Sequence, residues 1–167
     1  MPEASSRWAR WLAVSAAVVV LDLATKAWVS ASYSLGDVRE VTPFFNMVLM
    51  HNTGAAFSFL AQAGGWQRWF FTGITIVISA AILVMLRRQH GRGVSLGLAL
   101  VLGGALGNLY DRLTLGHVVD FIQVHAAGYY WPAFNVADSA ISVGVAILIW
   151  DSLRAGRGAA PAQQEKP

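Results

Sequence analysis

The sequence of 167 residues contains no cysteine. This absence excludes disulfide frameworks, thiolate nucleophiles, metal sites with cysteine ligands and a lipidated cysteine within the chain. Charged residues are also scarce, at 13%, whereas hydrophobic residues make up 56% before the 16 glycines are added. A soluble domain carries about 25% charged residues. The composition therefore excludes an intrinsically disordered chain and indicates a membrane protein.

Four apolar stretches have the ~17–25 residues that a helix needs to cross the hydrocarbon core of a bilayer. The second and third contain no charged residue. The stretches predict an all-α membrane protein with four transmembrane helices, forming a single domain over residues 1–153. A disordered tail, rich in Ala, Gly, Gln and Pro, is expected over residues 154–167. The predicted spans are residues 11–30, 69–86, 94–110 and 134–150.

The first span could also be a cleavable signal peptide, because two arginines precede it and small residues follow it. Asp22 and Lys26 argue against cleavage, since the apolar region of a signal peptide is uncharged over its 7–15 residues. We therefore expect the first span to be a membrane helix.

Positive charge is distributed unevenly over this four-span topology. Eight of the twelve lysines and arginines lie before the first span, between the second and third, or after the fourth. By the positive-inside rule both termini are expected in the cytoplasm, with the connections 31–68 and 112–133 on the outer side. The predicted membrane topology thus explains where the positive charges behind the net charge of +3 lie. Because they do not cluster on a binding face, no nucleic-acid partner is expected.

The first outer connection contains two β-leaning runs, Val38–Val41 and Phe44–Met50, split by Pro43 and followed by the turn signal Asn52-Thr53-Gly54. These features predict a small extended or β-like platform outside the cytoplasm, at the membrane surface. An aromatic belt is expected at the outer interface. Its members are Trp66, Trp69, Tyr129, Tyr130 and Trp131.

Ionisable and amide side chains gather at the outward ends of the predicted spans. A charge at the bilayer centre costs at least ~2.5–3.5 kcal/mol on insertion scales, so such groups are functional-site hypotheses by default. We expect them to meet at one depth near the outer surface. They are Asp22 and Lys26 in the first span, Asn108, Asp111 and Arg112 near the end of the third, Asp120 in the second outer connection, and Asn135 and Asp138 at the start of the fourth.

Asp120 and Asp138 lie 18 residues apart, a natural spacing for two groups that flank an out-and-back connection between antiparallel helices. If their carboxyl groups meet in a poorly hydrated pocket, repulsion and desolvation raise one pKa and the pair holds a single proton. One carboxylate can then deprotonate a water while the protonated partner hydrogen-bonds a scissile carbonyl. This is aspartyl peptidase chemistry, which needs no metal and no nucleophilic side chain.

Structural interpretations of these acids stay open. Asp138 could favour the positive end of a helix dipole, an effect of ~0.3–1 kcal/mol, and Asp120 could pair with Arg112 or a histidine. Asp111 and Arg112 are expected to form an interfacial salt bridge or a turn.

Other interpretations involve the remaining ionisable groups. Asp22 and Lys26, at i and i+4, are expected to pair on one helix face. Lys26 and Ser30 have the spacing of a Ser–Lys hydrolase dyad, but no oxyanion signature lies nearby. His117 and His125, with an aspartate between them, lack the helical spacing of a metal site, and none is expected.

Five ordered sequence blocks go beyond composition. They are DLATK at 22–26, NTGAAFS at 52–58, GGALGNLYDR at 103–112, GHVVDF at 116–121 and FNVADS at 134–139. Together they closely resemble the lipoprotein signal peptidase, or signal peptidase II, family. The resemblance covers residues 11–152, and the two tails have no counterpart.

The resemblance implies an aspartyl endopeptidase of the bacterial inner membrane, with four transmembrane helices and an active site facing the periplasm. Its substrates would be prolipoproteins that carry a diacylglyceryl group on the lipobox cysteine, cut just before that cysteine. The implied partners are these substrates, membrane lipid and the cyclic peptide inhibitor globomycin. No cofactor is expected, and the chain is expected to act as a monomer.

By the family's pattern, Asp120 and Asp138 form the catalytic dyad. Asp22, Lys26 and Asp111 are assigned as polar residues that support the site. The positions that line or shape the substrate pocket match Asn52, Gly54, Asn108, Arg112, Asn135 and Ala137.

A non-enzymatic four-helix carrier that uses buried acids as proton relays is the alternative function. A carrier should distribute polar groups toward both faces of the membrane, because its cargo must cross. The second and third spans contain no charge. The sequence therefore favours the peptidase.

Overall fold

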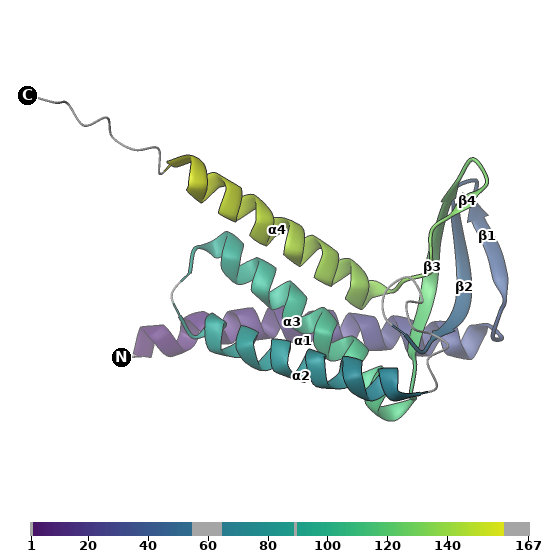
Figure 1. Cartoon of the computed structure of the whole chain (residues 1–167), viewed down its shortest axis with the longest axis horizontal. Coiled ribbons are helices and arrows are strands. Elements are labelled where there is room, and N and C mark those ends of the chain that lie inside the picture. Colours follow the sequence, from purple (N-terminus) through teal and green to yellow (C-terminus); the bar gives the residue numbers. More distant parts are fainter. Residues whose placement is uncertain (1, 55–64, 89, 159–167) are drawn as a thin grey trace, which may run out of the picture.

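The structure is a computed structural model that describes residues 2–54, 65–88 and 90–158. Four long helices form a bundle, and a small antiparallel sheet stands at one end of it (Figure 1). The helices are α1 (Pro2–Ser32), α2 (Trp66–Leu86), α3 (Arg92–Thr114) and α4 (Val136–Gly158). The strands are β1 (Val38–Thr42), β2 (Phe45–Asn52), β3 (Val118–Ala126) and β4 (Tyr129–Tyr130).

All four helices are long and apolar enough to cross a membrane, which confirms the predicted spans. Each helix extends past at least one end of its predicted span, because hydropathy marks only the apolar part of a helix while polar residues continue its hydrogen bonding. α4 also begins two residues later than predicted, at Val136. α4 continues to Gly158, past Arg154, where we expected the tail to begin. Residues 159–167 of that predicted tail lie outside the described residues.

α3 is the centre of the bundle and packs against α1, α2 and α4. Its contact with α4 is made backbone to backbone. A Cβ atom on Gly97 would lie 2.9 Å from the carbonyl oxygen of Gly144, and a Cβ on Gly144 would lie 2.7 Å from that of Gly97. Small residues allow membrane helices to approach this closely. The two helices therefore form a tight seam.

α2 uses only a narrow stripe for packing. Within its sequence, Thr72, Ser79, Ile82 and Leu86 are buried at spacings of three to seven residues, which places them along one face. Most of the remaining apolar surface points outward, with Val77 69% exposed. Such a surface is stable against lipid acyl chains and not against water.

The sheet has the strand order β1-β2-β3-β4, and every neighbouring pair is antiparallel. β1 and β2 confirm the predicted platform. β3 and β4 come from the second outer connection, which we had not assigned to the platform. The polar residues Asp120, Gln123 and His125 interrupt the apolar pattern of β3, so the sequence gives no clear strand signal there.

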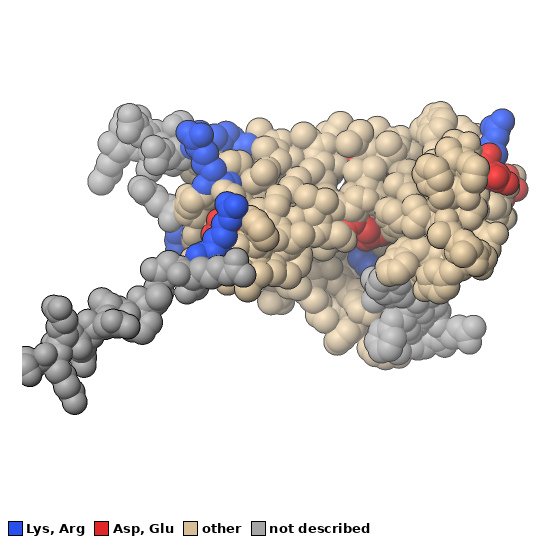
Figure 2. Space-filling model, turned by 90° about the horizontal axis from the view of Figure 1, so that it is seen from above, with Lys and Arg blue, Asp and Glu red and all other residues tan. Residues whose placement is uncertain are grey.

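The sheet and the chain termini lie at opposite ends of the bundle (Figure 1). Lysine and arginine side chains gather at the end from which both termini emerge (Figure 2). There the guanidinium carbons of Arg10, Arg87 and Arg154 lie 4.8–5.7 Å from the centroids of tryptophan rings. At the opposite end, the five aromatic residues of the predicted belt are exposed.

A candidate active site between the sheet and the bundle

Asp120 lies on β3 and is only 2% exposed. Its two carboxyl oxygens accept hydrogen bonds from two side-chain amides: Nδ2 of Asn52 donates to Oδ2 at 3.0 Å, and Nδ2 of Asn135 donates to Oδ1 at 2.8 Å. Backbone N–H groups fix both amides, since Oδ1 of Asn52 accepts from Gly54 and Oδ1 of Asn135 accepts from Asp138. The two NH₂ groups must therefore face Asp120.

The environment of Asp120 disfavours its ionised form. Burial, and then the neighbouring negative charge of Asp138, raise the pKa of Asp120 to about 7. The hydrogen bonds from Asn52 and Asn135 and the positive charge of Lys26 lower this pKa but do not cancel the effect. Two interacting carboxyl groups titrate as a unit, so the raised pKa of Asp120 favours a state near neutral pH in which the pair holds one proton.

Asp138 is held at the start of α4 by local structure. Phe134 pairs with Ile122 of β3 through backbone hydrogen bonds in both directions. The next residue, Asn135, caps α4, because its Oδ1 accepts the N–H of Asp138 at 2.9 Å. Asp138 therefore occupies the first turn of the helix, where the helix dipole stabilises negative charge.

Two asparagines connect the two aspartates. Nδ2 of Asn108, on α3, donates to Oδ1 of Asp138 at 2.8 Å. Oδ1 of Asn108 accepts from Nδ2 of Asn135 at 3.2 Å, and Asn135 in turn donates to Asp120. The chain Asp138–Asn108–Asn135–Asp120 is thus continuous, and it brings together α3, α4 and β3.

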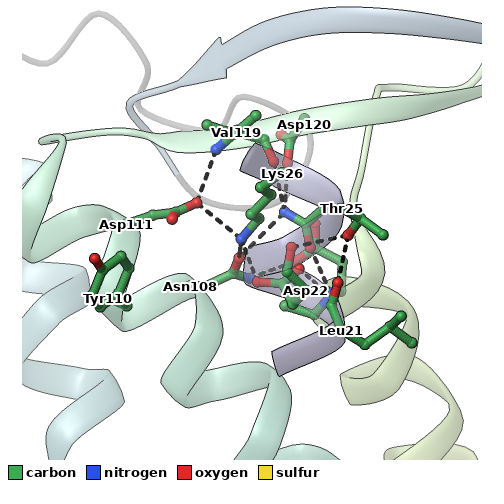
Figure 3. A network of polar contacts seen from close by, with 12 residues as sticks. Leu21, Asp22, Thr25, Lys26, Asn108, Tyr110, Asp111, Val119 and Asp120 are labelled. Atoms are coloured by element: carbon green, nitrogen blue, oxygen red, sulfur yellow. Dashed lines mark hydrogen bonds and ion pairs between the residues drawn. The ribbon is translucent and has the colours of Figure 1, made fainter. Parts of the chain in front are cut away.

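A buried ion cluster lies behind this chain (Figure 3). Nζ of Lys26 lies 2.7 Å from Oδ2 of Asp22, which confirms the predicted i,i+4 pair. The same nitrogen lies 2.9 Å from Oδ2 of Asp111 and donates to Oδ1 of Asn108 at 3.0 Å. The prediction that Asp111 pairs with Arg112 is wrong, because adjacent residues on a helix point in different directions and Asp111 turns toward α1.

Arg112 faces a different part of the site. Its guanidinium nitrogens lie 3.4 Å from the carbonyl oxygen of Gly54 and 3.5 Å from that of Asn108. Its Cζ lies 5.7 Å from the centre of the Phe71 ring on α2. Arg112 therefore supplies a positive charge beside the aspartates without forming an ion pair with Asp120, whose hydrogen-bond partners are amides.

A cavity of about 650 Å³ opens beside the aspartates, between α2 and α4, with α3 at its base. Asp138 lines it, whereas Asp120 is not among its lining residues. The polar lining comprises Asn52, Thr75, Asn108, Arg112, Asp138, Ser139 and Ser142. The rest is apolar and includes Ile78, Val101, Ala105, Trp131, Phe134 and Ile141.

The predicted pocket residues divide into two groups. Asn52, Asn108 and Arg112 line the cavity. Asn135 and Ala137 have no exposed surface and lie behind it, where they hold other residues in place. Gly54 contributes its backbone to Asn52 and Arg112.

The sequence did not identify the cavity residues of α2 and α4. Thr75 and Ser142 face the cavity from opposite walls. The small polar residues Thr72, Thr75 and Ser79 follow one another at helical spacing, a signal that could have marked this face of α2.

The two alternative chemistries that the sequence disfavoured, a metal site and a Ser–Lys dyad, have no matching geometry among the described residues. His117 stacks on His51 with ring centroids 3.7 Å apart, and His125 stacks on Tyr130 at 5.0 Å. No group of three or more His, Asp or Glu side chains suited to a metal occurs in the described ranges. The ammonium of Lys26 is committed to Asp22, Asp111 and Asn108, not to Ser30.

Comparison with known proteins gives consistent matches over nearly the whole chain. The family model for signal peptidase (SPase) II matches residues 14–154. The lipoprotein signal peptidase of Burkholderia thailandensis is 53% identical over 152 residues, which cover 90% of this chain and 92% of that protein. The lipoprotein signal peptidase of Paraburkholderia phytofirmans is 50% identical over 156 residues, covering 93% and 91%.

Solved structures match as well. A bacterial membrane enzyme determined by the in meso method at 2.3 Å resolution superposes with a TM-score of 0.83 and 32% identity, covering 94% of this chain and 95% of the other. A second one, at 1.9 Å resolution, gives a TM-score of 0.76 and 34% identity, covering 87% and 93%.

Proposed function

Because the chain belongs to the signal peptidase II family, we propose that Asp120 and Asp138 form the catalytic dyad of this bacterial membrane peptidase. The enzyme removes signal peptides from prolipoproteins, as its family does. Membership of a peptidase family argues against the alternative function, a non-enzymatic four-helix carrier. The single observation that supports the dyad is the asparagine chain that links these two acids beside a cavity.

The mechanism follows from a pair that shares one proton. The ionised carboxylate accepts a proton from a water molecule, whose oxygen attacks the carbonyl carbon of the scissile bond. The protonated carboxyl group donates a hydrogen bond, and then its proton, to the carbonyl oxygen. Collapse of the resulting gem-diol breaks the C–N bond: the carboxylate that lost its proton takes one back from a gem-diol hydroxyl, and the other, now protonated, carboxyl group gives its proton to the departing amine. One water is consumed, and the dyad regains its starting state.

The hydrogen bonds of the site support this mechanism. Both oxygens of Asp120 are held by amides, and Asp138 is held at Oδ1 by Asn108. In the described residues no hydrogen bond to Oδ2 of Asp138 is present, and this residue lines the cavity. Preorganised groups of this kind need little rearrangement in the transition state. Arg112 adds a positive charge near the developing oxyanion.

The cavity suits a substrate that stays in the membrane. Its walls include the apolar residues Ile78 of α2 and Ile141 of α4, and α2 exposes apolar surface along its length. We propose that a diacylglyceryl-modified cysteine leaves its acyl chains in the bilayer, while the bond before that cysteine reaches Asp138 between these two helices. A globomycin-type peptide would compete for the same space.

We further propose that the enzyme lies in the inner membrane with both termini in the cytoplasm, so that the site faces the periplasm. The arginines at the terminal end of the bundle support this orientation through the positive-inside rule. The chain has no cysteine, so single cysteines at Leu35 and Gly91 offer a clean test. A membrane-impermeant maleimide added to intact spheroplasts should label L35C and not G91C, and the reverse pattern would refute the orientation.

The decisive experiment measures cleavage of a diacylglyceryl-modified lipobox peptide by the purified enzyme in lipid. Asp120→Asn and Asp138→Asn should each lower kcat by roughly 10⁴-fold, because loss of either carboxyl group removes acid–base catalysis. Asp151→Asn is the matched control, since Asp151 lies on the same helix as Asp138 but near Gly93 at the opposite end.

The control variant should retain wild-type kcat, and the wild-type enzyme should leave an unmodified peptide uncut and be inhibited by globomycin. Substantial turnover by folded Asp120→Asn or Asp138→Asn would exclude the dyad. Equal cleavage of modified and unmodified peptides would exclude the proposed lipid requirement.

A further inference from the structure

The buried ammonium group of Lys26 is connected to the backbone just before each of the two aspartates. Its partner Asp22 accepts, through Oδ1, the N–H of Ala137 at 2.9 Å, and Ala137 precedes the first-turn aspartate of α4. Its partner Asp111 accepts, through Oδ2, the N–H of Val119 at 3.2 Å, and Val119 precedes the aspartate of β3. One side chain thus holds both backbone segments.

A third contact of Lys26 fixes the direction of a side-chain amide. An ammonium group has three donors and no acceptor, so the atom of Asn108 that faces it at 3.0 Å must be Oδ1. The NH₂ group of Asn108 then has to point away, and it donates to Oδ1 of Asp138 at 2.8 Å. Three oxygens, from Asp22, Asp111 and Asn108, thus lie within 3.0 Å of Nζ.

From these contacts we propose that Lys26 is a positioning residue that sets both the spacing of the two catalytic aspartates and the direction of the amide that holds Asp138. The inference rests on the proposed dyad and assigns Lys26 no contact with substrate. Lys26 is therefore more than one half of a supporting ion pair: Figure 3 shows its contacts with Asp22, Asp111 and Asn108, the three groups that lead to the two aspartates.

Stability alone does not explain this arrangement. Lys26 is 3% exposed and Asp22 has no exposed surface, so these groups lose their hydration on folding. Replacing a buried ion pair by apolar residues is often neutral or stabilising. Here two carboxylates face one ammonium, and each carboxylate accepts a backbone N–H beside an aspartate of the dyad. The positions of these contacts are explained by alignment of the site.

Lys26 also acts on the dyad through its charge. The charged groups that act on Asp120 are Lys26 from α1, Arg112 from α3 and Asp138 from α4. Asp22 and Asp111 are the ion-pair partners of Lys26. Among the causes that set the pKa of Asp120, the positive charge of Lys26 lowers it. Removal of this charge should therefore raise the pH at which the dyad loses its shared proton.

The test compares Lys26→Met, Lys26→Arg and the control Thr25→Val in the full-length enzyme. Thr25 is next in sequence, but among the residues that the structure describes its Oγ1 bonds only the backbone oxygens of Leu21 and Asp22. For each variant, kcat and KM for the diacylglyceryl-modified peptide are measured from pH 5 to 9, together with thermal unfolding in the same lipid.

Lys26→Met should lower kcat by roughly 100-fold with little change in KM, because a misplacement of about 1 Å can cost that much. Its upper pH limb should move to higher pH, since the positive charge of Lys26 lowers the pKa of Asp120. Lys26→Arg keeps the charge, but its planar fork cannot reach the same three acceptors. The Lys26→Arg variant should have a lower kcat than the wild type but the same upper limb of the pH–rate profile. Thr25→Val should match the wild type in both.

The proposal is overturned if folded Lys26→Met keeps the kcat of the wild type and the upper limb of its pH–rate profile. It is also overturned if the activity of this variant falls only in proportion to its folded fraction while the upper limb stays at the wild-type pH. If Lys26→Met shows no unfolding transition, Lys26→Arg decides, and a wild-type kcat in that variant overturns positioning. Failure of the dyad itself has a separate signature, which is cleavage by Asp120→Asn or Asp138→Asn whatever Lys26 variants do.

Discussion

The bundle has two very different seams. Along the α3–α4 seam, backbones touch at glycines, and the polar chain of the site continues the contact into β3. Along the α2–α4 seam, the helices stand apart and enclose the cavity. Asp120 is buried next to the closed seam, whereas Asp138 lines the cavity. The closed seam therefore holds the chemical groups in register, and the open seam leaves room for a substrate.

The largest expected effect on stability is a pH dependence caused by Asp120, the buried acid next to the closed seam. Because the pKa of Asp120 is raised to about 7 in the folded protein, its stabilising contribution is complete below the unfolded pKa of about 4 and is lost as pH rises through about 7. The unfolding free energy of the wild type should fall by at most roughly 4 kcal/mol over this window. Chemical unfolding at pH 4.5 and pH 8 measures it.

The Asp120→Asn variant has no titratable carboxyl group at position 120, so its unfolding free energy should change much less between these two pH values. A wild type whose stability is flat from pH 4.5 to 8, or a variant whose stability changes with pH as much as that of the wild type, would contradict the buried environment of Asp120.

A second prediction tests the backbone contact of the closed seam. A Cβ atom on Gly104 would collide with the carbonyl oxygen of Ala137, next to Asp138. Gly104→Ala should therefore destabilise the protein by about 1–3 kcal/mol, as overpacking does, and should lower kcat by displacing the start of α4. Thermal unfolding and peptide cleavage measure the two effects, and a fully active, stable variant would refute the tight seam.

A third prediction concerns the open seam. Ser142 lines the cavity from α4 and is exposed, so a larger side chain there fills space without straining the bundle. Ser142→Phe should raise KM by about tenfold, equivalent to ~1.4 kcal/mol of binding, while the unfolding temperature stays close to that of the wild type. Loss of stability with unchanged KM would show that this seam is packed and not open.

The smallest effect is expected for Gly73→Ala, which is the matched control for Gly104→Ala. Gly73 lies on the exposed face of α2, and a Cβ atom there meets nothing within 4 Å. Gly73→Ala should change the unfolding free energy by less than about 1 kcal/mol, in the stabilising direction given by helix propensity. Its kcat and KM should equal those of the wild type, and any marked loss would mean that α2 has a partner on this face.

Much of the architecture follows from the sequence because the bilayer restricts the choices. Runs of apolar residues predict the four helices, and the β-leaning runs predict β1 and β2. The i,i+4 pair of Asp22 and Lys26 follows from helix geometry alone. These features depend on local spacing.

Features that depend on helix rotation or on long-range pairing were not predictable. Asp111 was expected to pair with its neighbour Arg112, but the rotation of α3 against α1 turns it to Lys26. β3 forms because β2 offers it an edge, although its own pattern is mixed. Asn135 caps α4 and also reaches Asp120, a double role that only the pairing of Phe134 with Ile122 makes possible.

The order of the parts along the chain has a consequence for biogenesis. Lys26 is made early, Asp120 only after three helices, and Asp138 last, at the start of α4. Since synthesis and insertion proceed from the N-terminus, a growing chain has no complete proteolytic centre until its final helix enters the membrane. Under the proposed dyad, the enzyme cannot cut other nascent chains beside it during its own insertion.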